Sequence, residues 1–418
     1  MTAIVATLNK HAVAIAADSA VTFGNTHKVV NTGNKVFTLS KYEPVAIMTY
    51  NNATFMGIPW DIIIKEYRKE IDKTKYATIE LYKDNFLEYL QKNILPTRVN
   101  NNVIHQFLSE SITAFYIKVF NKVLHQQPPA ETIAIDLLKK EIITQHNSLS
   151  KFEVCPQMKT ISLETFKSFA RKEFDGMYAN PNLFKMPDEI KNLFEESCYY
   201  LHTRKCEDAI FSGLVFVGYG DSQIFPSLRS VNVSCVVDTS LKFFETNSVD
   251  IQNIGITSCV IPYAQKDVMQ TLLDGINPTF KNLIGKITYS SYLSLRNAIV
   301  SELKIKGGCD DIIVKLNSID LKRLLVETGN KLDVAMQDAY TKNLINTIGM
   351  LNKEDLADMA ESFISLTSLV RRMSPGEETV GGPVDVAVIS KGDGFIWIKR
   401  KHYFQPEFNN QFFYNYNR

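Results

Sequence analysis

The chain has 418 residues, of which 45% are hydrophobic and 22% are charged, a balance typical of a globular protein that buries a substantial core. With 46 basic and 45 acidic side chains, the formal net charge is +1, so no whole-protein field attracts nucleic acid or an anionic membrane. The sequence also has no run of eighteen apolar residues and no Lys/Arg cluster with interleaved aromatics, which argues against a membrane and against a nucleic-acid partner.

The spacing of cysteine and histidine predicts no metal site. The six cysteines form no CxxC pair, and the seven histidines form no HExxH or HxxxH pair, so we expect neither zinc nor another cofactor. Unpaired cysteines in a chain of this length are typical of reduced, mostly buried thiols, which indicates a cytoplasmic protein. No GxSxG sequence is present, which excludes the usual serine hydrolase.

The first residues predict a β-hairpin that is covered on both faces. Segments 2–8 and 11–17 are apolar at nearly every position, and Asn9-Lys10 between them suits a tight turn. Strands that are apolar on both sides lie between two layers of structure. A secretory signal is the alternative, but no positive charge precedes the run, and Lys10 with His11 interrupts it.

This hairpin would bring the first carboxylate of the chain close to the first hydroxyl. A two-residue turn makes Thr2 face Ala17, with Asp18 just beyond. Removal of Met1, which precedes a small residue, would expose the amine of Thr2 beside its own hydroxyl. An α-amino group has a pKa near 8 and suits the role of general base for a threonine nucleophile. From the hairpin alone a structural interpretation stays open, in which Thr2 begins a strand and Asp18 caps a turn.

The rest of the chain alternates between strand and helix patterns. Apolar residues recur at helical spacing over about 56–205 and 265–372. Further strands are predicted at 29–40, 44–50, 209–220, 227–238, 252–263, 384–390 and 395–401. A layered sheet core with helices outside satisfies this order.

The opening TAIVATLNKHAVAIAADSAVT resembles the start of a proteasome β-subunit or of its bacterial relative, the HslV peptidase. The resemblance places the family's catalytic threonine on Thr2 and its aspartate on Asp18, and NTGNKVF supplies the family's lysine as Lys35. The positive charge of this lysine would lower the pKa of the hydroxyl and stabilise the developing alkoxide, while Asp18 would hold the lysine in place.

Three later segments are similar to the same family, in the same order. GLVFVGYGDSQIFPSLRSV resembles its central hairpin, and TVGGPVDVAVISKGDG resembles its closing strand pair. ITSCVIPYAQ resembles the segment that holds its active-site serine, which would be Ser258. The resemblance covers about half of the chain.

Four positions depart from the family's pattern. The arginine that follows the aspartate is Ala20 here. The glycine of the oxyanion hole is Thr49, whose backbone N–H could still donate to an oxyanion. Near the end of the chain Glu377 stands in for an aspartate and Val380 for a serine, so the hydrogen-bond network that orients the amine is altered.

The resemblance implies an α+β fold, the four-layer αββα sandwich of N-terminal nucleophile (Ntn) hydrolases, with additional helical insertions. We expect one domain over 1–418. Its core would lie at about 1–95, 206–278 and 346–402, with insertions at about 96–205 and 279–345 and a tail at 403–418.

The implied activity is that of a threonine peptidase. Thr2 would be the nucleophile, assisted by Asp18, Lys35, Ser258 and Glu377. Family members self-assemble, so we expect a homo-oligomer, either a ring or a helical array, that acts on peptide or protein substrates, and a regulatory ATPase would be a partner. Two alternatives stay open: a catalytically inactive scaffold or interaction protein, and an amidase for a small amide.

Other local patterns are better explained by structure. Gly218-Tyr219-Gly220 lacks the rest of a GxGxxG phosphate loop, so we interpret it as a turn. The acidic segment 307–311 has no partner ligands around it and is interpreted as a solvated loop. Cys259 fits a buried strand thiol better than a nucleophile.

Overall fold

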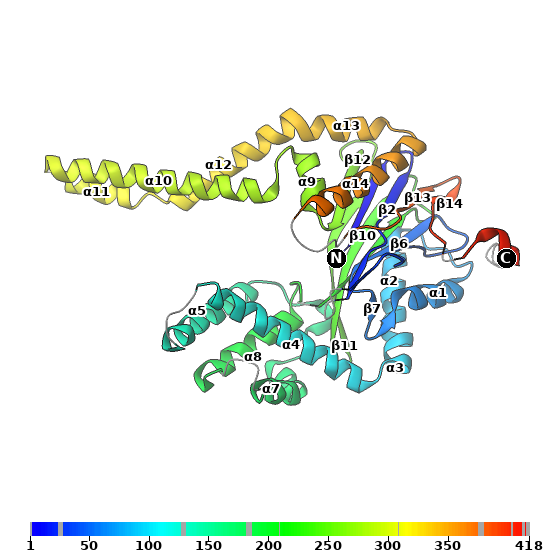
Figure 1. Cartoon of the computed structure of the whole chain (residues 1–418), viewed down its shortest axis with the longest axis horizontal. Coiled ribbons are helices and arrows are strands. Elements are labelled where there is room, and N and C mark those ends of the chain that lie inside the picture. The colour runs from blue at the N-terminus through cyan, green and yellow to red at the C-terminus, as the bar shows by residue number, and fades with distance from the viewer. Residues whose placement is uncertain are drawn as a thin grey trace.

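The computed structural model describes residues 2–23, 28–126, 131–180, 186–208, 210–307, 309–374, 380–402, 404–411 and 414. Over these residues the chain has a mixed α/β fold with antiparallel sheets, helices packed around them, and one long helical projection (Figure 1). The predicted sheet core with helices outside is confirmed at this level.

Two five-stranded antiparallel sheets form the centre of the fold. The first has the strand order β12-β1-β2-β13-β14, and the second has the order β11-β10-β9-β6-β5. The strands of the first sheet are β1 (Ala3–Asn9), β2 (Val13–Ala17), β12 (Ser258–Ala264), β13 (Asp385–Ser390) and β14 (Gly394–Lys399). Those of the second are β5 (Val36–Thr38), β6 (Val45–Asn51), β9 (Ser212–Gly218), β10 (Ser227–Val237) and β11 (Ser240–Asp250). Two short pairs flank them: β3 (Val21–Phe23) with β4 (Lys28–Val30), and β7 (Thr54–Phe55) with β8 (Ile58–Pro59).

The alternation of side chains along β1 explains why this strand is buried at every position and mostly apolar. Ile4 and Leu8 join a buried cluster with Val215 of the second sheet, so one face of β1 lies against that sheet. Ala3 and Val5 point the other way and pack with residues of the C-terminal helices. Every residue of β1 is buried, as the prediction of a hairpin covered on both faces requires.

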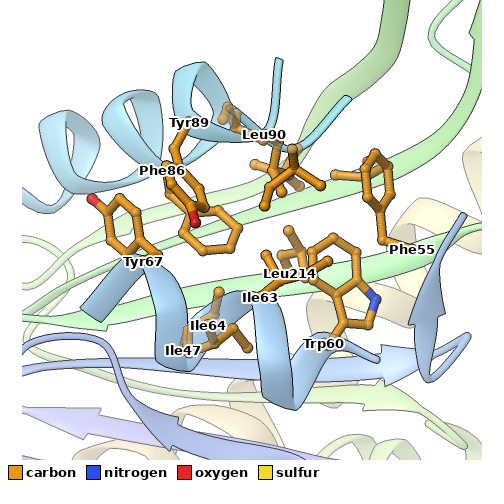
Figure 2. Close-up of a cluster of buried hydrophobic side chains, with 14 of the residues drawn as sticks. Ile47, Phe55, Trp60, Ile63, Ile64, Tyr67, Phe86, Tyr89, Leu90 and Leu214 are labelled. Carbon is orange, nitrogen blue, oxygen red and sulfur yellow. The ribbon is translucent and has the colours of Figure 1, made fainter. Parts of the chain in front are cut away.

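Helices cover the outer face of each sheet. α14 (Lys353–Met373), α9 (Asp267–Asp274) and α13 (Lys342–Met350) contribute to the cluster outside the first sheet. α1 (Trp60–Ile71) and α2 (Ile79–Tyr89) pack outside the second, where Figure 2 shows Trp60 and Ile63 gathered with Phe86 and Leu214. The ring centroids of Tyr67 and Phe86 lie 4.9 Å apart in an edge-to-face contact.

A separate helical bundle lies at one end of the second sheet (Figure 1). Its core is built around Phe115, Phe174 and Phe194, and reaches the sheet at Cys235 and Val237 of β10. The helices between α2 and β9 are η1 (Leu90–Ile94), α3 (Leu95–Arg98), α4 (Asn101–Leu124), α5 (Glu131–Leu149), η2 (Pro156–Met158), α6 (Leu163–Phe169), α7 (Arg171–Tyr178) and α8 (Asp188–Thr203). The division of the chain into a core and insertions stays a prediction.

A long helical projection leaves the body between α9 and α13. It consists of α10 (Pro278–Lys306), α11 (Asp310–Asn317) and α12 (Leu321–Met336), and the short η3 (Gln337–Thr341) joins it to α13. Figure 1 shows α10 and α12 side by side, extending away from both sheets with α11 at the far end. A last short helix, η4 (Pro406–Phe408), follows β14.

The first hairpin has a different register from the predicted one. Ile4 pairs with Ala17 and Leu8 with Val13, and the N–H of Asn9 donates to the carbonyl oxygen of Ala12 at 3.0 Å, so the two turn residues are Lys10 and His11 and not Asn9 and Lys10. The side chain of Asn9 causes this, because its Oδ1 accepts hydrogen bonds from the N–H groups of His11 and Ala12 at 2.9 and 3.1 Å. The shift keeps each residue on its expected face, because it moves the pairing by an even number of residues.

Two other strand predictions need correction. The strand predicted at 29–40 is interrupted and gives β4 and β5, with a turn between them. β11 was not predicted, because its polar half-exposed residues give only a weak strand pattern. None of the helices in the described part of the chain combines the length and apolar character that a bilayer crossing requires.

Candidate active site

Thr2 lies directly before β1 and is only 6% exposed. Its carbonyl oxygen accepts a hydrogen bond of 3.2 Å from the backbone N–H of Gln265, the residue after β12. The next residue, Ala3, donates from its N–H to Oδ1 of Asp18 at 2.9 Å and accepts from the Asp18 N–H at 3.1 Å. The start of β1 is therefore held from both neighbouring strands.

Asp18 is buried and its carboxylate is fixed by hydrogen bonds. Oδ1 accepts from the N–H of Ala3 and from Nζ of Lys35, and Oδ2 accepts from the N–H groups of Ala20 and Gly381 at 3.1 and 3.3 Å. Both oxygens of this buried group are thus satisfied. Ala20, where the resemblance would place an arginine, contributes only backbone atoms to these bonds.

Lys35 lies beside Asp18 in the same buried region. Its Nζ donates to Oδ1 of Asp18 and to the carbonyl oxygen of Ala20, both at 2.6 Å, and the side chain is 6% exposed. Burial lowers the pKa of Lys35 from its ordinary value near 10.5, and the charge of Asp18 opposes this shift. The structure therefore brings together Thr2, Asp18 and Lys35, which the sequence analysis had grouped from a segment of 34 residues.

Glycine at position 33 allows the lysine segment to approach the strand end. The N–H of Gly33 donates to the carbonyl of Ser19 at 3.0 Å, and a Cβ on Gly33 would lie 2.3 Å from Cγ2 of Val21. A larger residue would push the segment away. Gly33 thus helps to place Lys35 against Asp18.

A cavity of about 540 Å³ opens beside these residues. Thr2, Lys35 and Thr49 line it together with polar residues of the β6–α1 region, among them Asn52 and Asp61. A larger cavity, of about 840 Å³, lies between α10 and α12, away from Thr2. The smaller cavity is the better candidate site, because a nucleophile, a cation and a concave surface coincide there.

The predicted oxyanion donor is wrong. The backbone N–H of Thr49 donates to the carbonyl oxygen of Lys35 at 2.9 Å, as part of the pairing of β6 with the segment before β5. This N–H is therefore engaged within the protein. Thr49 still lines the cavity.

Asn52 offers a donor that the sequence analysis did not identify. Its Oδ1 accepts from the N–H of Thr54 at 3.3 Å, while its Nδ2 has no acceptor among the described residues. The preceding Asn51 has a left-handed backbone conformation with φ of 70°, which directs the chain away from β6 at this point. The sequence signal that could have indicated this corner is the pair Asn51-Asn52 at the end of an apolar strand, because asparagine tolerates the left-handed conformation.

The prediction for Ser258 is also wrong. Ser258 pairs with Asn9, at the opposite end of β1 from Ala3, and its Oγ donates to the carbonyl of Ile345 at 2.7 Å. It lies six positions before Ala264, the partner of Ala3, which is about 20 Å of strand. The residue of this segment that reaches Thr2 is Gln265 instead.

The C-terminal segment contributes backbone atoms. Glu377 lies outside the described residues. Val380 is fully buried, and the following Gly381 donates to Asp18 and accepts from the N–H of Ser19 at 3.1 Å. Because these contacts are made by backbone atoms, sequence motifs could not predict them.

A second buried ion pair lies close enough to influence Lys35. Asp385, at the start of β13, accepts from the backbone N–H of Lys401 at 2.9 Å and from its Nζ. The charge of Lys401 lowers the pKa of Lys35 and the charge of Asp385 raises it, both less than burial does. The sequence analysis missed this pair, whose members lie 16 residues apart on a terminal hairpin.

Comparison with solved structures returns matches at low similarity. A comparison with models of known protein families finds no match, and no curated protein matches either. Two Anbu proteins are among the structures that match. A Gly-1 mutant of Anbu from Hyphomicrobium sp. strain MC1 has a TM-score of 0.30 and 9% identity, over 98% of this chain and 91% of that chain. Anbu, described as an ancestral beta-subunit, from Yersinia bercovieri has a TM-score of 0.26 and 10% identity, over 99% and 94% of the two chains.

These matches correct the family resemblance drawn from the sequence. The two neighbours described above are Anbu proteins, which are distinct from the proteasome β-subunits and HslV peptidases that the motifs suggested. At these TM-scores the likeness carries no argument about activity. The case for function depends on the geometry of this chain.

Proposed function

We propose that the chain is an N-terminal threonine hydrolase that cleaves peptide bonds. The observation that carries the proposal is the position of Thr2, which lies at the wall of a cavity and next to a residue clamped by the buried Asp18–Lys35 pair. Two sheets in contact, with helices outside each, are compatible with the αββα sandwich of Ntn hydrolases, and we propose that fold as well.

The proposed reaction begins once the residue before Thr2 has been removed. The Thr2 hydroxyl transfers its proton to the free α-amine and attacks the substrate carbonyl carbon, forming a tetrahedral oxyanion. The protonated amine then gives the proton to the leaving amine of the substrate, and an ester on Thr2 is left. Water, activated by the same amine, hydrolyses this ester and restores the hydroxyl.

Lys35 and Asn52 have separate proposed roles. The cationic Nζ of Lys35 would stabilise the alkoxide of Thr2, and Asp18 would position that Nζ. The Nδ2 group of Asn52, which lines the same cavity, would donate to the oxyanion in place of the engaged Thr49 N–H. The predicted self-assembly and the predicted regulatory ATPase stay proposals.

One observation favours a second candidate, a catalytically inactive scaffold. The backbone N–H of Thr49 is engaged by the carbonyl oxygen of Lys35, so it is not free to bind an oxyanion. A scaffold needs neither a free amine nor an oxyanion donor.

Intact-mass measurement combined with active-site labelling tests these candidates. The threonine hydrolase requires a protein lighter by one methionine residue and an adduct of a β-lactone or vinyl sulfone on Thr2, absent from Thr2→Ala. Retention of Met1, or a processed chain that takes up no label, would favour the scaffold. A processed and labelled enzyme that cleaves small amides but no member of a peptide library would be an amidase instead.

A further inference from the structure

The peptide group that joins Thr2 to Ala3 is held by hydrogen bonds on both of its sides. Its N–H donates to Oδ1 of Asp18 at 2.9 Å, and its carbonyl oxygen accepts from the N–H of Gln265 at 3.2 Å. Because a peptide group is planar, two such bonds fix its orientation and with it the position of the Cα atom of Thr2. Lys35 supports the Asp18 side of this arrangement. The other side depends on how Gln265 is placed.

Gln265 lies in a sharp turn between a strand and a helix. Only Gln265 and Lys266 connect the end of β12 to the start of α9. Ala264, the last residue of β12, has a left-handed backbone conformation with φ of 63°, which alanine disfavours. Such a conformation persists only where surrounding contacts hold it. We call residues 264–266 the β12 corner, and the direction of the Gln265 N–H depends on the contacts that hold this corner.

Arg371, in the last turn of α14, makes contacts on both sides of the β12 corner. Its Nε donates to Oε1 of Gln265, and its Nη2 donates to Oδ1 of Asp267, the first residue of α9. The two helices lie side by side outside the first sheet (Figure 1). A guanidinium group is planar and presents its N–H donors in a fixed fork, so the two bonds set Gln265 and Asp267 in a defined relation.

The bond between Arg371 and Gln265 is shielded from most of the solvent. Gln265 is 7% exposed, and the side chain of Arg371 is 24% exposed. Water therefore competes less for this bond than for one at the open surface. The side chain of Asp267 is more exposed, at 39%, so its ion pair with Arg371 contributes less to stability.

We propose that Arg371 is a positioning residue for Thr2 that acts through Gln265. Arg371 holds the β12 corner, the corner directs the Gln265 N–H to the carbonyl oxygen of Thr2, and this bond fixes the residue that carries the nucleophile. The role in catalysis rests on the threonine hydrolase proposed above. Because Arg371 acts on the position of Thr2, its loss should slow acylation without weakening the binding of the reagent that acylates Thr2.

The dependence of acylation on β-lactone concentration tests this role. Arg371→Leu should lower the maximal acylation rate of Thr2 by about 10- to 100-fold, because a small misplacement of a reacting group is costly, and should leave the half-saturating concentration unchanged. A purely structural role would instead lower the fraction of the protein that takes up the label. An unchanged maximal rate in Arg371→Leu would overturn the proposal.

Arg323→Leu is the matched control for the loss of an arginine from a helix. Nε of Arg323 donates to Glu327 on α12 at 3.0 Å, and the side chain of Arg323 is 78% exposed. This variant also loses one ion pair, but in the helical projection, so it should be acylated at the wild-type rate. A loss in Arg323→Leu equal to that in Arg371→Leu would contradict a specific role for Arg371.

A second substitution tests whether Arg371 acts by holding the β12 corner. Glycine adopts the left-handed conformation without the steric cost that alanine has. Ala264→Gly should therefore restore part of the acylation rate that Arg371→Leu loses. A double variant as slow as Arg371→Leu would contradict an action through the corner.

Hydrogen exchange at single-residue resolution separates this proposal from the proposed activity. In Arg371→Leu the amide of Gln265 should lose protection, because its bond to Thr2 is weakened. The amide of Asn9, which donates to Ala12 at the other end of β1, should keep its protection. A wild-type protein that takes up no label would refute the hydrolase, and loss of protection at Gln265 would still support the placement of Thr2 by Arg371. Equal protection of Gln265 in wild type and Arg371→Leu would overturn the placement, whatever the activity.

Discussion

Lys35 donates to Asp18 at 2.6 Å in a region where the two side chains are 6% and 1% exposed. The pair joins three distant segments, because Asp18 also accepts from Ala3 and from Gly381. Its position next to Thr2 gives it both a structural and a proposed catalytic role, and the two roles can be separated by experiment.

Replacing only one member of this ion pair should lower the free energy of unfolding more than replacing both members. Lys35→Met or Asp18→Asn leaves an uncompensated polar group in a buried site, for which we expect a loss of about 3–5 kcal/mol in the free energy of unfolding. The double variant should lose less than the sum of the two single losses. Chemical denaturation of all four proteins measures this coupling, and additive losses would show that the two groups do not interact.

The stability contributed by Lys35 should depend on pH in a defined direction. Burial lowers the pKa of Lys35 in the folded protein, whereas the unfolded chain keeps a value near 10.5. Between these two values the unfolded state binds more protons, so the free energy of unfolding rises with pH. The difference in unfolding free energy between wild type and Lys35→Met should therefore grow in favour of wild type as the pH rises from neutral towards 10. A difference that shrinks over this range would indicate that Asp18 outweighs burial.

Asn52 should matter for acylation of Thr2 more than for stability. Loss of one oxyanion donor lowers catalytic rates by about 10²–10³ in hydrolases, so Asn52→Ala should slow labelling by a β-lactone to that extent. Asn102→Ala, on the exposed first turn of α4, is the matched control and should label at the wild-type rate. Equal labelling rates for wild type and Asn52→Ala, at unchanged melting temperature, would remove Asn52 from the mechanism.

The sequence was informative about the fold where side-chain alternation is strong. β1 is buried at every position because Ile4 and Ala3 face two different cores, and its mostly apolar sequence predicts a covered strand. The position of the turn was predicted one residue too early, because Oδ1 of Asn9 accepts hydrogen bonds from the N–H groups of His11 and Ala12, which the residue pattern does not reveal. β11 was missed because it lacks a strong apolar pattern. Its pairing with β10 depends more on backbone hydrogen bonds.

The candidate site was predictable for Thr2, Asp18 and Lys35, but not for the groups around them. Asp18 and Lys35 have the chemistry that a threonine nucleophile needs, and short segments place them. Ser258 was misplaced because the sequence does not specify the register of β12 against β1. The contributions of Gln265 and Gly381 are made by backbone atoms, which any residue type could supply, so no residue pattern indicates them.

A fully buried ion pair should anchor the helical bundle to the second sheet. Nζ of Lys242, on β11, donates to Oδ1 of Asp208 at 3.0 Å and to the carbonyl of Leu201, in the last turn of α8, at 2.6 Å. Both side chains are almost completely excluded from solvent, at 0% and 1% exposed. A cation at the C-terminal end of a helix also interacts favourably with the helix dipole.

Removing this lysine should therefore loosen the bundle selectively. Lys242→Met leaves the Asp208 carboxylate buried without its partner, so we expect a loss of about 3–5 kcal/mol, partly recovered in the Lys242→Met/Asp208→Asn double variant. Because Lys242 contacts α8 and not the Thr2 site, the amides of α8 should lose hydrogen-exchange protection while those of β1 keep theirs. Equal loss of protection in both segments would mean that the bundle and the sheets unfold as one cooperative unit.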